Sequence, residues 1–135
     1  GCVCSPDGRI VAGLFGPPET VEFRTIFAAV RDALPAPPPG AGPFELSGPG
    51  VLERLFAEAG LKVLDSDQVN CPFHYADFET FWQAIVAAGP FQGMLQTVDE
   101  SQLKAAMHDA TEAYRLDSGA IQIQPNIFKY VVAAV

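Results

Sequence analysis

Three cysteines and a histidine are the residues of this sequence whose chemistry suits a metal ion. Cys2, Cys4, Cys71 and His74 could offer thiolates and an imidazole, which are ligands that zinc prefers in proteins. Structural zinc sites usually contain ligand pairs separated by about two to four residues, and the single residue between Cys2 and Cys4 does not fit that spacing. We therefore predict no metal site, and we interpret the cysteines as free thiols because their number is odd.

A histidine beside a tyrosine and an aspartate suggests acid–base chemistry. His74, Tyr75 and Asp77 lie in the stretch CPFHYADF, where a carboxylate could orient an imidazole that acts as a base. A histidine in a short polar turn also commonly faces the solvent or caps a helix, so both interpretations stay open. His108 lies among carboxylates on a polar segment, and we interpret it as part of a solvated helical face.

An aromatic group follows this stretch at helical spacing. Phe78, Phe81, Trp82 and Phe91 could pack in a core, or they could line a pocket for a small molecule. We keep both alternatives and assign no catalytic residue. The candidate substrate-binding residues are His74, Tyr75, Phe78 and Trp82.

The charge of the chain excludes several classes of partner. The sequence has 135 residues with 16 acidic and 8 basic side chains, which gives a formal net charge of −8. Nucleic acids and anionic membranes attract basic proteins, so we exclude both as partners. The sequence contains no apolar run near the roughly 20 residues that span a bilayer, and no basic and apolar leader at its start. We expect one domain over residues 1–135 in a soluble, cytoplasmic protein.

The first half of the chain predicts two strands and two helices. The apolar run Arg9–Phe15 predicts a strand buried on both faces, and residues 20–34 have helical periodicity before a proline-rich loop. In FELSGPGVLERLFAEAGLKVLD, Ser47 is expected to cap a helix that ends at Gly60, a position that favours positive φ. A second strand is predicted over residues 61–69.

The second half predicts two more helices and a terminal strand. Asp77 is expected to cap a helix that Gly89-Pro90 ends, and a more polar helix follows with Leu103, Met107 and Tyr114 facing inward. The ending AIQIQPNIFKYVVAAV predicts a long terminal strand, in which Pro125 implies a bulge or an edge position.

The order of these elements resembles the C-terminal half of class I S-adenosylmethionine-dependent methyltransferases. The run PDGRIVAGLFG resembles the fifth strand of that family with its preceding turn, and FELSGPGVLERLFAEAGLKVLD is similar to its helix that leads into strand six. FKYVVAAV is similar to its final antiparallel strand. The resemblance implies that the last strand lies between the other two and is antiparallel to both.

The residues that hold the cofactor in this family have no counterpart here. The family binds S-adenosylmethionine through a glycine-rich loop after its first strand and an acidic residue at the end of its second. Those positions would precede Gly1, and we interpret the glycines of AGLFG and GPG as structural. The resemblance implies that residues 16–27 and a helical insert over residues 78–115 shape the acceptor pocket, but it assigns no cofactor to this chain.

The sequence therefore predicts an α+β fold with a small mixed three-stranded sheet over Arg9–Phe15, residues 61–69 and residues 127–135, covered by about four helices. The function implied is recognition of a substrate or partner by a methyltransferase-derived C-terminal domain that is not catalytic by itself. Two alternatives remain: a small enzyme or ligand-binding protein that uses the His74 region, and a structural dimerisation module. The partner is expected to be a second copy of the chain or a missing N-terminal half, because the sequence provides no strand that could pair with the other edge of the first strand.

Overall fold

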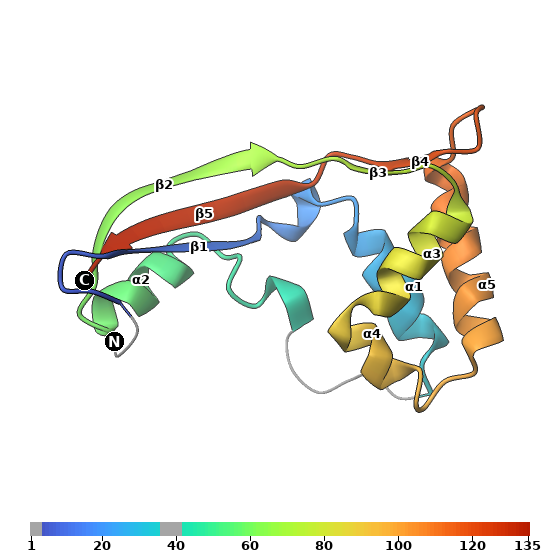
Figure 1. Cartoon of the computed structure of the whole chain (residues 1–135), viewed down its shortest axis with the longest axis horizontal. Helices are drawn as coiled ribbons and strands as arrows, with labels where there is room; N and C mark the ends of the chain where they lie inside the picture. The colour runs from blue at the N-terminus through green and yellow to red at the C-terminus, as the bar shows by residue number, and fades with distance from the viewer. Residues whose placement is uncertain (1–3, 36–41) are drawn as a thin grey trace. The chain divides into compact units, whose positions relative to one another are not determined.

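The computed structural model describes residues 4–35 and 42–135, and these residues form two compact units (Figure 1). Unit 1 contains the described residues of 1–21 and 40–71 together with 125–135. Unit 2 contains those of 22–39 together with 72–124. The chain therefore passes between the units several times, and each unit is built from segments that are distant in the sequence.

Unit 1 contains a three-stranded sheet with the C-terminal strand at its centre (Figure 1). The strands are β1 (Arg9–Phe15), β2 (Lys62–Asn70) and β5 (Ile127–Ala134), in the order β1-β5-β2. β5 is antiparallel to both neighbours, so the predicted central position of the last strand is confirmed. The prediction of a mixed sheet was wrong, because each neighbouring pair is antiparallel.

The two faces of this sheet differ in burial. Along β5, Lys129, Val131 and Ala133 are buried, whereas the residues that alternate with them are partly exposed. The same alternation in β1 leaves Val11 65% exposed, so the prediction that this strand is buried on both faces was wrong. An antiparallel sheet commonly has one face on the core and one face toward solvent, and this sheet follows that rule.

The helix α2 (Val51–Glu58) packs on the buried face of the sheet and leads into β2. Its N-cap is Gly50, at a φ of 72°, and no side chain caps the helix there. The expected cap, Ser47, instead donates a hydrogen bond from its hydroxyl to the carbonyl oxygen of Phe15 at 2.6 Å. Gly60 has a φ of 80°, as predicted for the residue that ends this helix.

Unit 2 combines four α-helices with a two-stranded sheet. The helices are α1 (Arg24–Ala33), α3 (Phe78–Ala87), α4 (Gly89–Met94) and α5 (Glu100–Thr111), and β3 (Phe73–Tyr75) pairs antiparallel with β4 (Ile121–Ile123). Its core includes Ile26, Phe81, Leu103, Met107 and Ile121, none of them more than 1% exposed. The described residues thus form five α-helices, where about four were predicted, and a second sheet that was not predicted.

Local signals set the helix boundaries of unit 2 with varying success. Asp77 caps α3 as predicted, since its carboxylate accepts a hydrogen bond from the backbone N–H of Thr80 at 2.7 Å. Gly89-Pro90 ends that helix but also begins α4, because proline is accepted in the first turn of a helix. α1 begins at Arg24 and not at residue 20, after the short 3₁₀ helix η1 (Pro18–Thr20) of unit 1. The described residues also form the 3₁₀ helices η2 (Gly42–Phe44) and η3 (Glu112–Tyr114).

The predicted long terminal strand is divided into two strands in different sheets. Gln124-Pro125-Asn126 separates β4 from β5, and proline at this point cannot donate a ladder hydrogen bond. Asn126 is fully buried, its backbone N–H donates to the side-chain oxygen of Asn70 at 2.9 Å, and its carbonyl accepts from the N–H of Cys71 at 2.8 Å. These bonds fix the start of β5 beside the end of β2.

Candidate functional site

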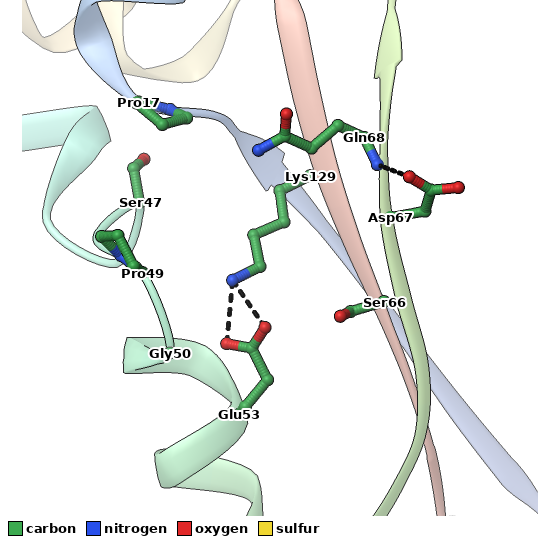
Figure 2. Close-up of a pocket in the computed structure, with 9 residues that line it drawn as sticks. All are labelled: Pro17, Ser47, Pro49, Gly50, Glu53, Ser66, Asp67, Gln68 and Lys129. Atoms are coloured by element: carbon green, nitrogen blue, oxygen red, sulfur yellow. Dashed lines mark hydrogen bonds and ion pairs between the residues drawn. The ribbon is translucent and has the colours of Figure 1, made fainter.

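An open pocket of about 410 Å³ lies on the buried-face side of the unit 1 sheet, at the N-terminal end of α2 (Figure 2). Strands β2 and β5 supply polar side chains to it, and the chain before α2 supplies small residues and prolines. The residues that line the pocket are Pro17, Ser47, Pro49, Gly50, Glu53, Ser66, Asp67, Gln68 and Lys129.

Lys129 and Glu53, which both line this pocket, form an ion pair (Figure 2). The Lys129 Nζ atom lies 2.6 Å from one carboxylate oxygen of Glu53 and 2.8 Å from the other. Lys129 is 8% exposed, because its position in the central strand turns its side chain to the face covered by α2. The hydrogen bond from Lys129 lowers the pKa of Glu53 below its usual value, which keeps this carboxylate ionised.

The polar side chains of β2 point in two directions around this ion pair. Ser66 and Gln68 extend toward the side of the strand on which Lys129 and Glu53 lie, whereas Asp67 points away from the pocket (Figure 2). This alternation follows from the period of two residues in a strand. Asp67 accepts a hydrogen bond from the backbone N–H of Gln68 at 2.8 Å.

The chemistry available in the pocket is hydrogen bonding to a polar group. The ammonium and carboxylate neutralise each other, and the hydroxyl of Ser66 and the amide of Gln68 add donors and acceptors. The hydroxyl of Ser47 already donates to the Phe15 carbonyl. These residues do not include a nucleophile hydrogen-bonded to a base, which covalent catalysis requires.

The predicted substrate-binding residues all lie in unit 2, but they differ in how far they are buried. His74 is exposed in the middle of β3, while its neighbours Phe73 and Tyr75 are partly buried. The ring of Tyr75 packs edge-on against Phe81 with centroids 5.1 Å apart, and burial raises the pKa of the Tyr75 hydroxyl. His74 and Tyr75 therefore point to opposite faces of the strand, as adjacent strand residues must.

Phe78 and Trp82 lie on α3 and contribute to packing. The ring centroid of Phe78 is 6.0 Å from that of Phe81 and 4.8 Å from that of His108. Trp82 is 2% exposed, and the Lys104 Nζ atom lies 5.8 Å from its ring centroid. Tyr75 and Phe78 thus both pack against Phe81, and Trp82 is part of the core.

None of these four residues lines the unit 1 pocket, and none lines a smaller polar hollow of unit 2. The residues that line that hollow are Glu112, Arg115, Leu116, Asp117 and Gly119. The sequence alone did not predict the Lys129–Glu53 pair. A lysine inside the apolar run IFKYVVAAV was the available signal, because strand alternation places it on the same face as two buried residues.

The possible zinc ligands are only partly described. Cys2 lies outside the described residues, and Cys4 and Cys71 are partly buried free thiols. Over residues 4–35 and 42–135, no three side chains of His, Cys, Asp or Glu are grouped as a metal ion requires. Within the same ranges, no helix has both the length and the apolar character needed to cross a membrane.

The comparisons with known proteins give no relative from which a role could be transferred. No protein-family model matches the chain, and no curated protein matches it. The strand order, the pocket and the surfaces of the two units are therefore the features that bear on function.

Proposed function

We propose that this chain is a methyltransferase-derived C-terminal domain that recognises a substrate or partner and is not catalytic by itself. The observation that carries the proposal is the strand order of unit 1. β1 and β2 run in the same direction, and the final strand β5 lies between them and is antiparallel to both. The resemblance to class I S-adenosylmethionine-dependent methyltransferases implies this arrangement for the last three strands of their sheet.

The path of the chain between these strands adds support. α2 is followed by Gly60, whose positive φ allows an abrupt turn into β2, as the helix before strand six of that family would require. Unit 2 contributes the residues between β2 and β5, from Pro72 to Gln124, together with α1. In the proposed protein this helical unit presents the recognition surface, with His74 as its exposed side chain on β3.

A catalytic role for the chain alone does not fit the residues that it contains. Methyl transfer requires a cofactor held against the acceptor atom. The residues that line the unit 1 pocket include an ion pair, two serines and a glutamine, and they do not form a glycine-rich loop between a strand and a helix that could hold the cofactor. S-adenosylmethionine binding is therefore assigned to another part of the proposed protein.

Calorimetric titration tests the proposal directly. The chain alone should give no saturable heat with S-adenosylmethionine, and a micromolar site would overturn the assignment. The genomic sequence immediately upstream should encode a glycine-rich loop after a strand and an acidic residue at the end of the next strand. An upstream sequence without them would also overturn it.

The role of unit 2 can be tested in a protein that contains both parts. Replacing the exposed His74 with alanine should raise KM for the acceptor and leave the Kd for S-adenosylmethionine unchanged. Asp109→Ala is a matched control, because Asp109 is 88% exposed on α5. If both substitutions changed KM for the acceptor equally, His74 would not be part of the recognition surface.

A further inference from the structure

The unit 1 pocket contains hydrogen-bonding groups that are available to a ligand. The strand register places Gln68 of β2 directly opposite Lys129 of β5, and Ser66 lies two residues away on the same face. Both β2 residues are exposed, and within the described part of the chain neither the Gln68 amide nor the Ser66 hydroxyl has a hydrogen-bond partner. An ammonium group has three N–H donors. The two carboxylate oxygens of Glu53 engage two of those of Lys129, which leaves the third for a ligand.

The charges beside these groups already balance each other. Lys129 is paired with Glu53, which also lies in the first turn of α2 and offsets the partial positive charge of that helix end. An anionic ligand would compete with Glu53 for the ammonium and would be repelled by the net charge of −8. A cationic ligand would compete with Lys129 for the carboxylate. A neutral ligand binds without separating the pair, and separating a largely buried pair is costly.

A primary carboxamide is a neutral group that matches the donors and acceptors of this pocket. The Gln68 amide has an acceptor oxygen and an N–H2 donor side by side in one plane. A second carboxamide can therefore pair with it through two hydrogen bonds, each from an N–H of one amide to the carbonyl oxygen of the other. The ligand carbonyl keeps a second lone pair for the third N–H of Lys129, and the ligand N–H2 keeps a second donor for the hydroxyl of Ser66.

The size and the remaining lining of the pocket suit a small ring attached to such a carboxamide. Pro17 and Pro49 add apolar ring surfaces to the polar side chains. The volume of about 410 Å³ lies within the roughly 300–1,000 Å³ that is typical of small-molecule sites. The 9 lining residues all belong to unit 1 (Figure 2), so a single compact unit forms this lining.

We infer that the unit 1 pocket binds a neutral small molecule through a primary carboxamide group, to which Gln68, Lys129 and Ser66 form hydrogen bonds. This inference goes beyond the proposed function and does not depend on it. The recognition surface proposed above lies in unit 2, whereas this pocket lies in unit 1.

Benzamide tests the inference with the whole chain, because it is a primary carboxamide on an apolar ring. A titration followed by backbone NMR should give saturable shifts at residues 66–68, in the first turn of α2 and at Lys129. The Kd should be in the millimolar range that is expected of so small a ligand. Benzoate and benzamidine have nearly the same shape but carry a negative and a positive charge, respectively. Both should bind about tenfold more weakly than benzamide, because each competes with one member of the ion pair.

The substitution Gln68→Glu tests the pairing of the two amides. It keeps the shape of the side chain, removes its N–H donors and leaves two acceptor oxygens that match the amidinium group of benzamidine. Benzamide should bind about tenfold more weakly to this variant than to the unchanged protein, and benzamidine about tenfold more tightly. Gln102→Glu is the matched control, because it introduces the same charge at an exposed position of α5 in unit 2. It should change neither affinity.

Four results would overturn the inference. The first is the absence of saturable shifts up to about 50 mM benzamide. The second is a set of shifts confined to unit 2. The third is binding of benzoate or benzamidine to the unchanged protein that is as tight as that of benzamide, which would show that the pocket does not select a neutral group. The fourth is an equal effect of Gln68→Glu and Gln102→Glu, which would show that the Gln68 amide does not contact the ligand.

Discussion

Lys129 in the central strand β5 and Glu53 in α2 form an ion pair that joins the unit 1 sheet to its covering helix. The Lys129 Nζ atom lies 2.6 and 2.8 Å from the two carboxylate oxygens, and the side chains are 10% and 25% exposed respectively. Breaking a largely buried pair leaves an uncompensated charge, whereas replacing both partners with apolar groups is often neutral. We therefore expect a single substitution in this pair to lower the free energy of unfolding more than replacement of both residues does.

Glu53→Gln should destabilise unit 1 by about 1–3 kcal/mol, because it leaves the Lys129 ammonium without its carboxylate partner. The double variant Glu53→Leu/Lys129→Met should lie within about 1 kcal/mol of the unchanged protein. Urea unfolding followed by the NMR signals of β5 measures both values. A single variant as stable as the unchanged protein would show that solvent already screens this pair.

The pKa of Glu53 predicts how this stabilisation depends on pH. The hydrogen bond from Lys129 lowers the pKa in the folded state below the usual value, so folding favours the ionised carboxylate. The contribution is fully present above the unfolded pKa of about 4.3 and is lost as pH falls through the lower folded value. The stability difference between the unchanged protein and Glu53→Gln should thus shrink below about pH 4. A difference that is independent of pH from 7 to 3 would contradict this assignment.

The sequence predicted the elements that have strong local signals. Arg9–Phe15 is β1 with the predicted bounds, Asp77 caps α3, and Leu103 and Met107 face the core from α5. Each of these predictions depends on a few neighbouring residues, such as a cap three residues before its target N–H. The predicted central position of β5 came from the family resemblance and not from local pattern.

The predictions from the sequence were wrong where tertiary contacts outweigh local preference. Ser47 could cap α2 or bond elsewhere, and the carbonyl of Phe15, distant in the sequence, determines the outcome. The apolar alternation of residues 121–135 does not indicate which sheet each strand joins, so the division at Pro125 was missed. The pocket was missed for the same reason, since Lys129 and Glu53 meet only in the folded unit.

Gly60 offers a test of the turn between α2 and β2. Its φ of 80° is favourable for glycine and unfavourable for residues with a Cβ atom. Gly60→Ala should therefore destabilise the protein by about 1–2 kcal/mol. Gly93→Ala is the matched control, because Gly93 lies inside α4 and an added Cβ atom would meet nothing within 4 Å. That control should be neutral or stabilising by up to about 1 kcal/mol. If urea unfolding showed the same change in stability for both variants, the positive φ of Gly60 would not require glycine.

The absence of a stoichiometric metal stays a prediction from the spacing of the cysteines. Elemental analysis of the purified protein should find well below one zinc per chain, because a single residue separates Cys2 and Cys4. Cys71→Ser is the informative variant, since Cys71 would be a ligand in any such site. One zinc per chain in the unchanged protein, lost in Cys71→Ser, would show that the spacing argument was wrong.

The edge of β1 that faces away from β5 is the feature that predicts pairing with another strand. β1 has one charged residue, Arg9, and no proline, whereas β2 at the other edge carries two exposed aspartates and a register irregularity between Val63 and Asp65. Charges and bulges protect sheet edges from pairing, so β2 is the better protected edge. In the proposed full protein a neighbouring strand would occupy the β1 edge, and in this chain alone we expect a second copy to do so.

The residues of β1 are compatible with a two-fold antiparallel pair centred on Ala12. This register places Val11 of one copy opposite Gly13 of the other, where an added Cβ atom would meet nothing within 4 Å, and it puts the two Arg9 side chains at opposite ends. Sedimentation equilibrium should therefore show a concentration-dependent dimer. Hydrogen exchange should identify the edge, because every second N–H of β1 points away from β5 and gains protection only when a second strand pairs there. A monomer up to millimolar concentration, or a dimer in which those alternate amides still exchange freely, would contradict pairing at this edge.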